Sequence, residues 1–114
     1  VAGRPVYEHV ADMAANKWNA NNNIGLVVGA TQPQPLRRVR ALIGDMPLLV
    51  PGVGSQGGDP RAVLEAASTN NGTGLIVNVS RAVLYAGQGA DYADEARKKA
   101  PKKMVYLKTT KIII

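Results

Sequence analysis

Three short runs of apolar residues constrain the fold of this chain more than any other feature of its sequence. They occupy residues 25–30, 46–50 and 74–78, so they begin 21 and 28 residues apart. Each run precedes a loop and then apolar residues at helical spacing. Buried parallel strands are near-continuous apolar runs, and strands that alternate with helices are typical of βα units. The sequence therefore predicts an α/β fold in which about three parallel βα units follow a leading helix over residues 5–18.

The length of the chain limits this fold to part of a barrel. With 114 residues, the chain can form one domain with a buried core. A complete barrel of eight βα units needs about 250 residues. We expect a partial (β/α) barrel over residues 1–100 and an atypical tail over residues 101–114. The tail ends in three isoleucines, which favours an edge strand or pairing with another chain over a disordered end.

The positive charge of the chain is concentrated at one end. The net charge is +6, but residues 97–114 contain seven basic residues and no acidic one, whereas residues 1–96 contain seven basic and eight acidic residues. A nearly neutral body argues against specific nucleic-acid binding, while the basic tail leaves a weak contact with nucleic acid or an anionic membrane open. No apolar stretch is long enough to span a membrane, and the first residues lack a signal-peptide pattern, so we expect a cytoplasmic location.

Several classes of chemistry are disfavoured by the residue types that the chain lacks. Without cysteine it has no disulfide, thiol nucleophile or cysteine metal site. The single histidine, His9, argues against a histidine metal cluster or a Ser-His-Asp triad, and we expect it to be structural or solvated. Asp59 before Pro60 is typical of a helix cap, and Glu65 has no acidic neighbour, so paired carboxylates for acid–base work are not indicated. The residue types therefore give no indication of a metal site.

The strongest functional signal is the glycine-rich loop at residues 51–60. It follows the second predicted strand and precedes a helix, so it lies at the carboxyl end of the sheet, where ligands bind in parallel α/β folds. Its glycines allow sharp turns that bring backbone N–H groups close to an anion, and the side-chain amide of Gln56 can donate as well. Glycines also make plain turns, so this loop alone leaves anion binding and a structural role open.

A second candidate site follows the third predicted strand. Ser80 and Arg81 stand where a helix begins, so the first-turn N–H groups, the helix dipole and a guanidinium would favour an anion. A capping serine and a solvated arginine explain the same two residues. Two such loops on consecutive strands, however, match the phosphate site formed by the last two loops of a βα barrel. We therefore predict that the chain binds a phosphate or sulfate anion.

Other conspicuous side chains are expected to be structural, with one exception left open. Thr31 follows the first predicted strand, where it either touches a ligand or caps the next helix. Trp18 is expected in the core. The arginines of the second predicted helix, Arg37, Arg38 and Arg40, are expected on its solvated face.

Four stretches occur in an order and at a spacing typical of a known family. The stretches are Pro-Val-Tyr-Glu-His-Val-Ala (5–11), Gly-Leu-Val-Val-Gly-Ala-Thr (25–31), Leu-Leu-Val-Pro-Gly-Val-Gly-Ser-Gln-Gly-Gly-Asp (48–59) and Gly-Leu-Ile-Val-Asn-Val-Ser-Arg-Ala (74–82). Through them, residues 5 to about 97 resemble the C-terminal part of the orotidine 5′-phosphate decarboxylase family, and in particular its bacterial, actinobacterial-type subgroup.

The resemblance implies a fold, a reaction and a set of site residues. The family is a βα barrel, usually a homodimer, which converts orotidine monophosphate to uridine monophosphate in pyrimidine biosynthesis without metal or organic cofactor. Gln56 and Arg81 would hold the 5′-phosphate of the substrate, with backbone amides near Gly57, Ser80 and Arg81. Pro51 would flank the pyrimidine, and Thr31 is a second candidate contact on that side.

The chain departs from the family pattern in the part that carries the chemistry. The family uses an interleaved Lys/Asp array that includes an Asp-x-Lys-x-x-Asp motif, in which the lysine protonates the carbon that loses carbon dioxide. No Asp-x-Lys-x-x-Asp occurs here, and the strands that would carry it, roughly the first five of the barrel, are missing. Those groups stabilise the charge that develops in the transition state. We therefore expect a fragment, whether natural, truncated or recombined, that retains phosphate binding but does not decarboxylate orotidine monophosphate by itself.

Two alternatives of other classes remain, together with one expectation about partners. The chain could be an engineered or recombined self-associating scaffold with no ligand function, or it could act through adhesion of its basic tail. Under every reading, a few βα units leave open sheet edges and an uncovered apolar surface. We therefore expect a homo-oligomer or a complex with a complementary barrel fragment.

Overall fold

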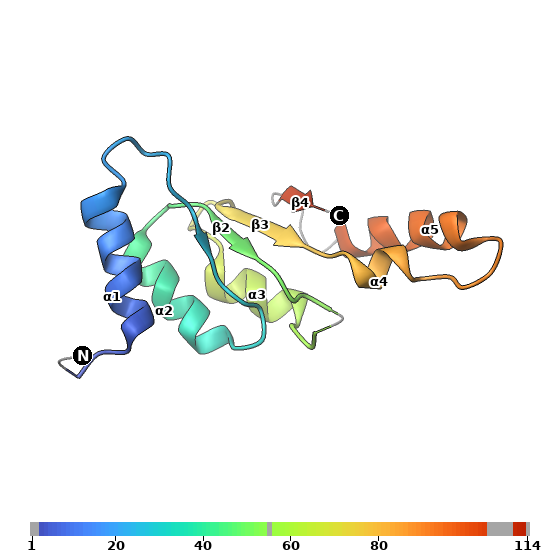
Figure 1. Cartoon of the computed structure of the whole chain (residues 1–114), viewed down its shortest axis with the longest axis horizontal. Helices are drawn as coiled ribbons and strands as arrows, with labels where there is room; N and C mark the ends of the chain where they lie inside the picture. Colours follow the sequence, from blue (N-terminus) through green and yellow to red (C-terminus); the bar gives the residue numbers. More distant parts are fainter. Residues whose placement is uncertain (1–2, 55, 105–110, 114) are drawn as a thin grey trace.

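The computed structural model describes residues 3–54, 56–104 and 111–113, and it shows one parallel sheet with helices packed against it (Figure 1). All pairings are parallel, in the order β1-β2-β3-β4. The strands are β1 (Leu26–Val27), β2 (Leu48–Val50), β3 (Leu75–Asn78) and β4 (Lys111–Ile113). The predicted α/β fold with three parallel βα units, a partial barrel, is confirmed, although each strand is shorter than its apolar run.

Helices precede and connect the strands as the periodicity predicts. Helix α2 packs against both α1 and α3, and these three helices lie on the same side of the strands, while α4 and α5 extend beyond the carboxyl end of β3 (Figure 1). The helices are α1 (Val6–Met13), α2 (Pro33–Ile43), α3 (Pro60–Ala67), α4 (Arg81–Leu84) and α5 (Tyr92–Met104). None of the helices in the described part of the chain is long and apolar enough to cross a membrane.

The leading helix differs from its prediction in how it ends and in which side it buries. A π-helical turn, η1 (Ala14–Trp18), follows α1 and presents Trp18 to solvent with 54% of its surface exposed, so the expected core position for Trp18 is wrong. The buried apolar residues of the segment are small, Ala11 and Ala14, and they allow close approach to α2; Glu8 is buried beside them. The larger apolar side chains of the same helix, Val6, Tyr7 and Val10, are exposed.

The core lies between the sheet and its helices. Along β2 and β3, residues that face the helices are fully buried, and the residues between them, such as Leu49 and Ile76, are only half-buried. The apolar runs predicted strands covered on both faces, and this is wrong for the described part of the chain. A barrel buries both faces of each strand only once it closes, and four strands do not close. The helix-facing core includes Leu36, Val39, Ile43, Leu48, Val50, Val63, Leu75 and Val77.

Arg40 of α2 is a structural residue rather than part of a solvated face. Its Nε donates to the carbonyl of Ala67 at 2.6 Å. Its Nη1 donates to the carbonyls of Gly44 and Met46, both at 2.7 Å, and its Nη2 donates to the carbonyl of Gly74 at 2.9 Å. Burial lowers the pKa of this guanidinium. The side chain therefore joins the end of α3, the turn after α2 and the start of β3. The prediction of a solvated Arg40 is wrong.

Arg38 and Arg37, also on α2, have different environments. Arg38 lies 3.1 Å from the carboxylate of Glu8, a buried residue of α1 that also contacts Arg4 at 3.4 Å. The hydrogen bond from Arg38 lowers the pKa of Glu8, and Arg4 adds to this effect. Arg37 is exposed, as expected. The pair therefore fastens α1 to α2, which is a role that the sequence did not indicate.

The tail contributes an edge strand, which confirms one of its two favoured interpretations. Strand β4 pairs with β3 in parallel, with Lys111 beside Ile76 and Ile113 beside Asn78. Helix α5 continues past residue 100, so the expected boundary between residues 100 and 101 falls inside a helix. The rest of the tail, residues 105–110 and 114, lies outside the described residues.

Candidate functional site

The glycine-rich loop after β2 folds back on itself. Gly54 N–H donates to the carbonyl of Gly58 at 2.8 Å, Gly57 N–H to that of Gly54 at 2.9 Å, and Gly58 N–H to that of Gly52 at 3.1 Å. Gly52 has a φ of +89°, and a Cβ there would lie 2.7 Å from Oε1 of Gln56. Glycine at this position adopts the left-handed backbone conformation without strain, and its lack of a Cβ lets the Gln56 carboxamide lie against the loop.

Asp59 ends this loop and begins α3. Its carboxylate accepts hydrogen bonds from the backbone N–H groups of Arg61 at 3.3 Å and Ala62 at 3.2 Å, and Pro60 occupies the first turn of the helix. The predicted helix cap is confirmed. The cap therefore defines where the loop ends and α3 begins.

A cavity of about 170 Å³ lies between this loop and the segment that follows β3. At about 30 Å³ per water molecule, it has room for five or six waters, so it is large enough to admit a phosphate group. Among the described residues that line it, Arg81 is the only one with a formal charge, so the cavity favours an anion. The lining residues are Pro51, Gly52, Val53, Gln56, Asn78, Val79, Ser80 and Arg81.

The second wall of the cavity is the start of α4. Ser80 precedes the helix and its hydroxyl donates to Oδ1 of Asn78 at 3.3 Å rather than capping α4. The helix has only four residues, so its dipole is small and a ligand would depend mainly on side chains. Arg81, the first helical residue, is exposed and lies on the cavity wall, where its guanidinium can reach an anion.

The structure brings together four of the six residues that the sequence analysis selected. Pro51, Gln56, Ser80 and Arg81 line the same cavity. Gly57 is exposed, is not among the lining residues, and donates its N–H to Gly54 within the loop. The internal hydrogen bonds of the loop therefore take up a donor that was expected to meet the phosphate.

Thr31 is the other selected residue that lies apart from the cavity. It is exposed, and Gln32 rather than Thr31 occupies the N-cap position of α2. Of the two roles left open for Thr31, that of helix cap is therefore wrong by one residue. Lining residues that the selection missed, Gly52, Val53, Asn78 and Val79, lie in the same two strand-end segments, so their position in the sequence was the signal that could have found them.

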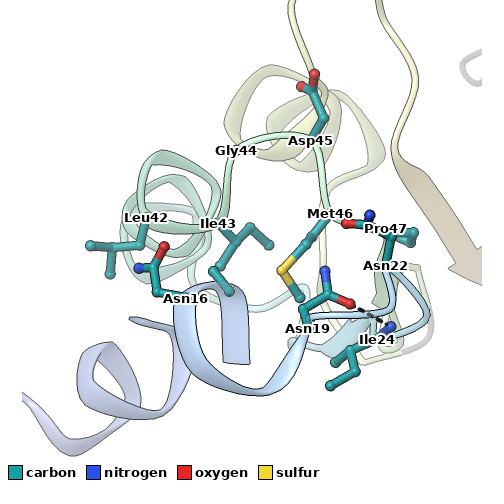
Figure 2. Close-up of a pocket in the computed structure, with 11 residues that line it drawn as sticks. Asn16, Asn19, Asn22, Ile24, Leu42, Ile43, Gly44, Asp45, Met46 and Pro47 are labelled. Atoms are coloured by element: carbon teal, nitrogen blue, oxygen red, sulfur yellow. Dashed lines mark hydrogen bonds between the residues drawn. The ribbon is translucent and has the colours of Figure 1, made fainter. Parts of the chain in front are cut away.

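A larger cavity of about 600 Å³ lies at the opposite, amino ends of the strands (Figure 2). The side chains of Asn16, Asn19 and Asn22 line it together with the turn between α2 and β2. Asn19 accepts a hydrogen bond from the backbone N–H of Ile24 at 3.0 Å, which is the bond drawn in Figure 2. In βα barrels this face serves stability and the carboxyl face carries function, so size alone does not make this cavity the candidate site.

The fold and the cavity define part of a βα barrel with an anion-compatible site at the carboxyl ends of its strands. Comparison with known families agrees, because the profile of the orotidine 5′-phosphate decarboxylase / HUMPS family matches residues 1–97. The chain belongs to this family. No cluster of three or more His, Cys, Asp or Glu side chains suited to a metal occurs within residues 3–54, 56–104 and 111–113.

Curated relatives extend well beyond the matched segment. The chain is 56% identical over 100 residues to the orotidine 5′-phosphate decarboxylase of Janthinobacterium sp. (strain Marseille). The aligned residues are 88% of this chain and 37% of that protein. It is 57% identical over 95 residues to the enzyme of Ralstonia nicotianae, covering 83% and 35%. The chain thus spans little more than a third of these relatives. Both come from betaproteobacteria, so they do not support the predicted actinobacterial-type subgroup.

Solved structures show the same relationship. The structure of Leishmania donovani UMP synthase matches with a TM-score of 0.76 and 41% identity, over 94% of this chain and 23% of that one. The Leishmania donovani OMP decarboxylase matches with a TM-score of 0.75 and 38% identity, over 96% and 41%. The arrangement of strands and helices described above is therefore the arrangement found in part of those proteins.

Proposed function

We propose that this chain is the C-terminal part of an orotidine 5′-phosphate decarboxylase of pyrimidine biosynthesis, located in the cytoplasm, and that it holds the 5′-phosphate of a nucleotide monophosphate. One observation carries the proposal. Gln56 comes from the loop after β2 and Arg81 from the segment after β3, yet both line one cavity of about 170 Å³. Two loops that are distant in sequence thus supply an amide donor and a cation to the same small space.

Each side chain of the cavity has a distinct part in holding the phosphate. The guanidinium of Arg81 can donate two parallel hydrogen bonds to phosphate oxygens. The amide of Gln56 and the hydroxyl of Ser80 supply neutral donors, since Ser80 can turn its proton from Asn78 to a ligand. Pro51 lines the same cavity at the end of β2, where it would face the rest of the nucleotide. The proposal leaves Thr31 out of the contacts.

Binding without decarboxylation is the second part of the proposal. Loss of carbon dioxide from the pyrimidine requires a proton donor and fixed charges beside the reacting carbon. Neither a carboxylate nor a lysine is among the described residues that line the cavity. The sequence also contains no Asp-x-Lys-x-x-Asp motif. The chain alone should therefore bind a nucleotide monophosphate and release no carbon dioxide from orotidine monophosphate.

Calorimetric titration with uridine monophosphate at low salt tests the proposal. Arg81→Ala should weaken binding by about 10- to 100-fold, because a charge-assisted hydrogen bond contributes about 1.5–3 kcal/mol. Arg37→Ala is the matched control, since Arg37 is an exposed arginine on α2 and does not line the cavity. If uridine monophosphate fails to bind the unmodified chain, or binds Arg81→Ala equally well, the proposal is wrong and a scaffold without ligand function becomes the better description.

A further inference from the structure

Strand β1 has an open edge. It is the first strand in the sheet order and pairs only with β2 among the described strands. The N–H groups of Leu26, Val28 and Ala30 donate to carbonyls of the β2 segment at 2.9–3.0 Å. Because alternate residues of a strand direct their backbone groups to opposite sides, Gly25, Val27 and Gly29 direct theirs away from β2. Such a row of backbone groups is a template for another strand.

An apolar groove runs beside this edge. It has a volume of about 370 Å³ and is lined by α1, β1 and the start of α2, including Tyr7, Val10, Pro35 and Val39. Residues along it are unusually exposed for their type, with Tyr7 and Val10 of α1 both at 40% and Val27 of β1 at 68%. The apolar side of α1 thus extends beyond the edge strand β1, over a space that no described strand fills.

The opposite edge of the sheet is different, because β4 covers β3 there. The described sheet has two edge strands, β1 and β4, and the apolar groove lies beside β1. The inner face is also open on the same strand, since Val27 is mostly exposed whereas its neighbours in the sheet, Leu49 and Ile76, are half-buried. A partner that fits must supply a strand parallel to β1 and apolar side chains for the groove.

The length of the relatives identifies such a partner. This chain spans 35–37% of the Janthinobacterium and Ralstonia proteins, so nearly two-thirds of each protein lies outside the match. A closed barrel has no free edge, and each strand is paired on both sides. We propose that the edge of β1 and its groove bind the remaining βα units of a family barrel, with one of their strands parallel to β1. This inference rests on the family part of the proposed function and not on phosphate binding.

The test mixes the full chain with the part of the Janthinobacterium relative that lies outside the match, made as a separate polypeptide. Sedimentation velocity should show a one-to-one complex, and hydrogen exchange should show new protection of the Val27 and Gly29 amides. If the partner is insoluble alone, the two are co-expressed and purified through a tag on the partner. Absence of this chain from the eluate would overturn the proposal.

Val27→Pro locates the contact. The N–H of Val27 points away from β2, so proline there removes no bond within the sheet and keeps the monomer folded, as circular dichroism would check. The variant should weaken the complex by at least about tenfold, whereas Tyr92→Lys, an exposed position on α5, should leave it unchanged. A complex that tolerates Val27→Pro overturns the proposal. The proposal is also overturned if the partner segment fails to bind and the chain instead forms a homodimer that Val27→Pro abolishes.

Failure of this inference is distinguishable from failure of phosphate binding. Arg81→Ala should lose uridine monophosphate and keep the partner, and Val27→Pro should show the reverse. If the chain binds the nucleotide but not the partner segment, only the docking surface is wrong.

Discussion

The two ends of the strands use arginine in opposite ways. At the amino ends, Arg40 donates to four backbone carbonyls and is half-buried. At the carboxyl ends, Arg81 is exposed on the wall of a small cavity. In the first case the guanidinium donors are taken up by backbone carbonyls, whereas in the second case the arginine is exposed beside the cavity. The comparison shows an arginine that stabilises the fold at one end of this sheet and an exposed arginine at the other end, where we propose that phosphate binds.

The largest effect expected at the amino ends follows Arg40→Ala. Four carbonyls lose the hydrogen bond that Arg40 donates, and a carbonyl that is left buried and unpaired costs about 1–3 kcal/mol. The free energy of unfolding in urea should fall by about 3 kcal/mol. Arg40→Lys should recover only part of this, because an ammonium cannot reproduce the guanidinium fork. Arg37→Ala should change stability by less than about 0.5 kcal/mol, and an equal loss in both variants would contradict the structural role of Arg40.

Asp59→Ala tests a structural residue that lies at the carboxyl ends of the strands, near the proposed phosphate site. Like Arg40, it should contribute to stability. Removing the cap from α3 should lower stability by about 1 kcal/mol in thermal or urea unfolding. Asp59→Asn should retain most of that stability, because asparagine also caps helices well. Nucleotide affinity should fall only modestly, since Asp59 does not line the cavity. A variant that binds nothing while remaining fully stable would show that Asp59 acts on the ligand directly.

The contact between α1 and α2 predicts the smallest effect, and one that depends on pH. Arg38 and Arg4 hold the pKa of Glu8 below its usual range. The folded-state pKa therefore lies below the unfolded value of about 4.3, so the stabilisation is present above that pH and is lost as the pH falls through the folded-state pKa. Thermal melts from pH 7 to pH 3 should show a shallower decline for Glu8→Gln than for the unmodified chain. Exposed Glu65, changed to Gln, should leave the profile as it was.

Much of the fold was predictable because its signals are local. The apolar runs predicted three parallel strands, and Asp59 before Pro60 predicted the start of α3, since both depend on neighbouring residues only. The candidate site was predictable in part for the same reason. Parallel strands end at one edge of the sheet, so loops after consecutive strands had to meet, and Gln56 and Arg81 do line one cavity.

By itself, the sequence determined the order of elements, the strand-end loops and the family pattern, because spacing and turn chemistry are written along the chain. Only the tertiary structure decided which groups those elements leave satisfied. Arg40 and Glu8 meet partners that are about 30 residues away in sequence, and Gly57 donates its N–H within its own loop. Trp18 and Val27 are exposed because no described segment packs over them. Burial depends on what lies alongside in space, and periodicity along one chain does not contain that information.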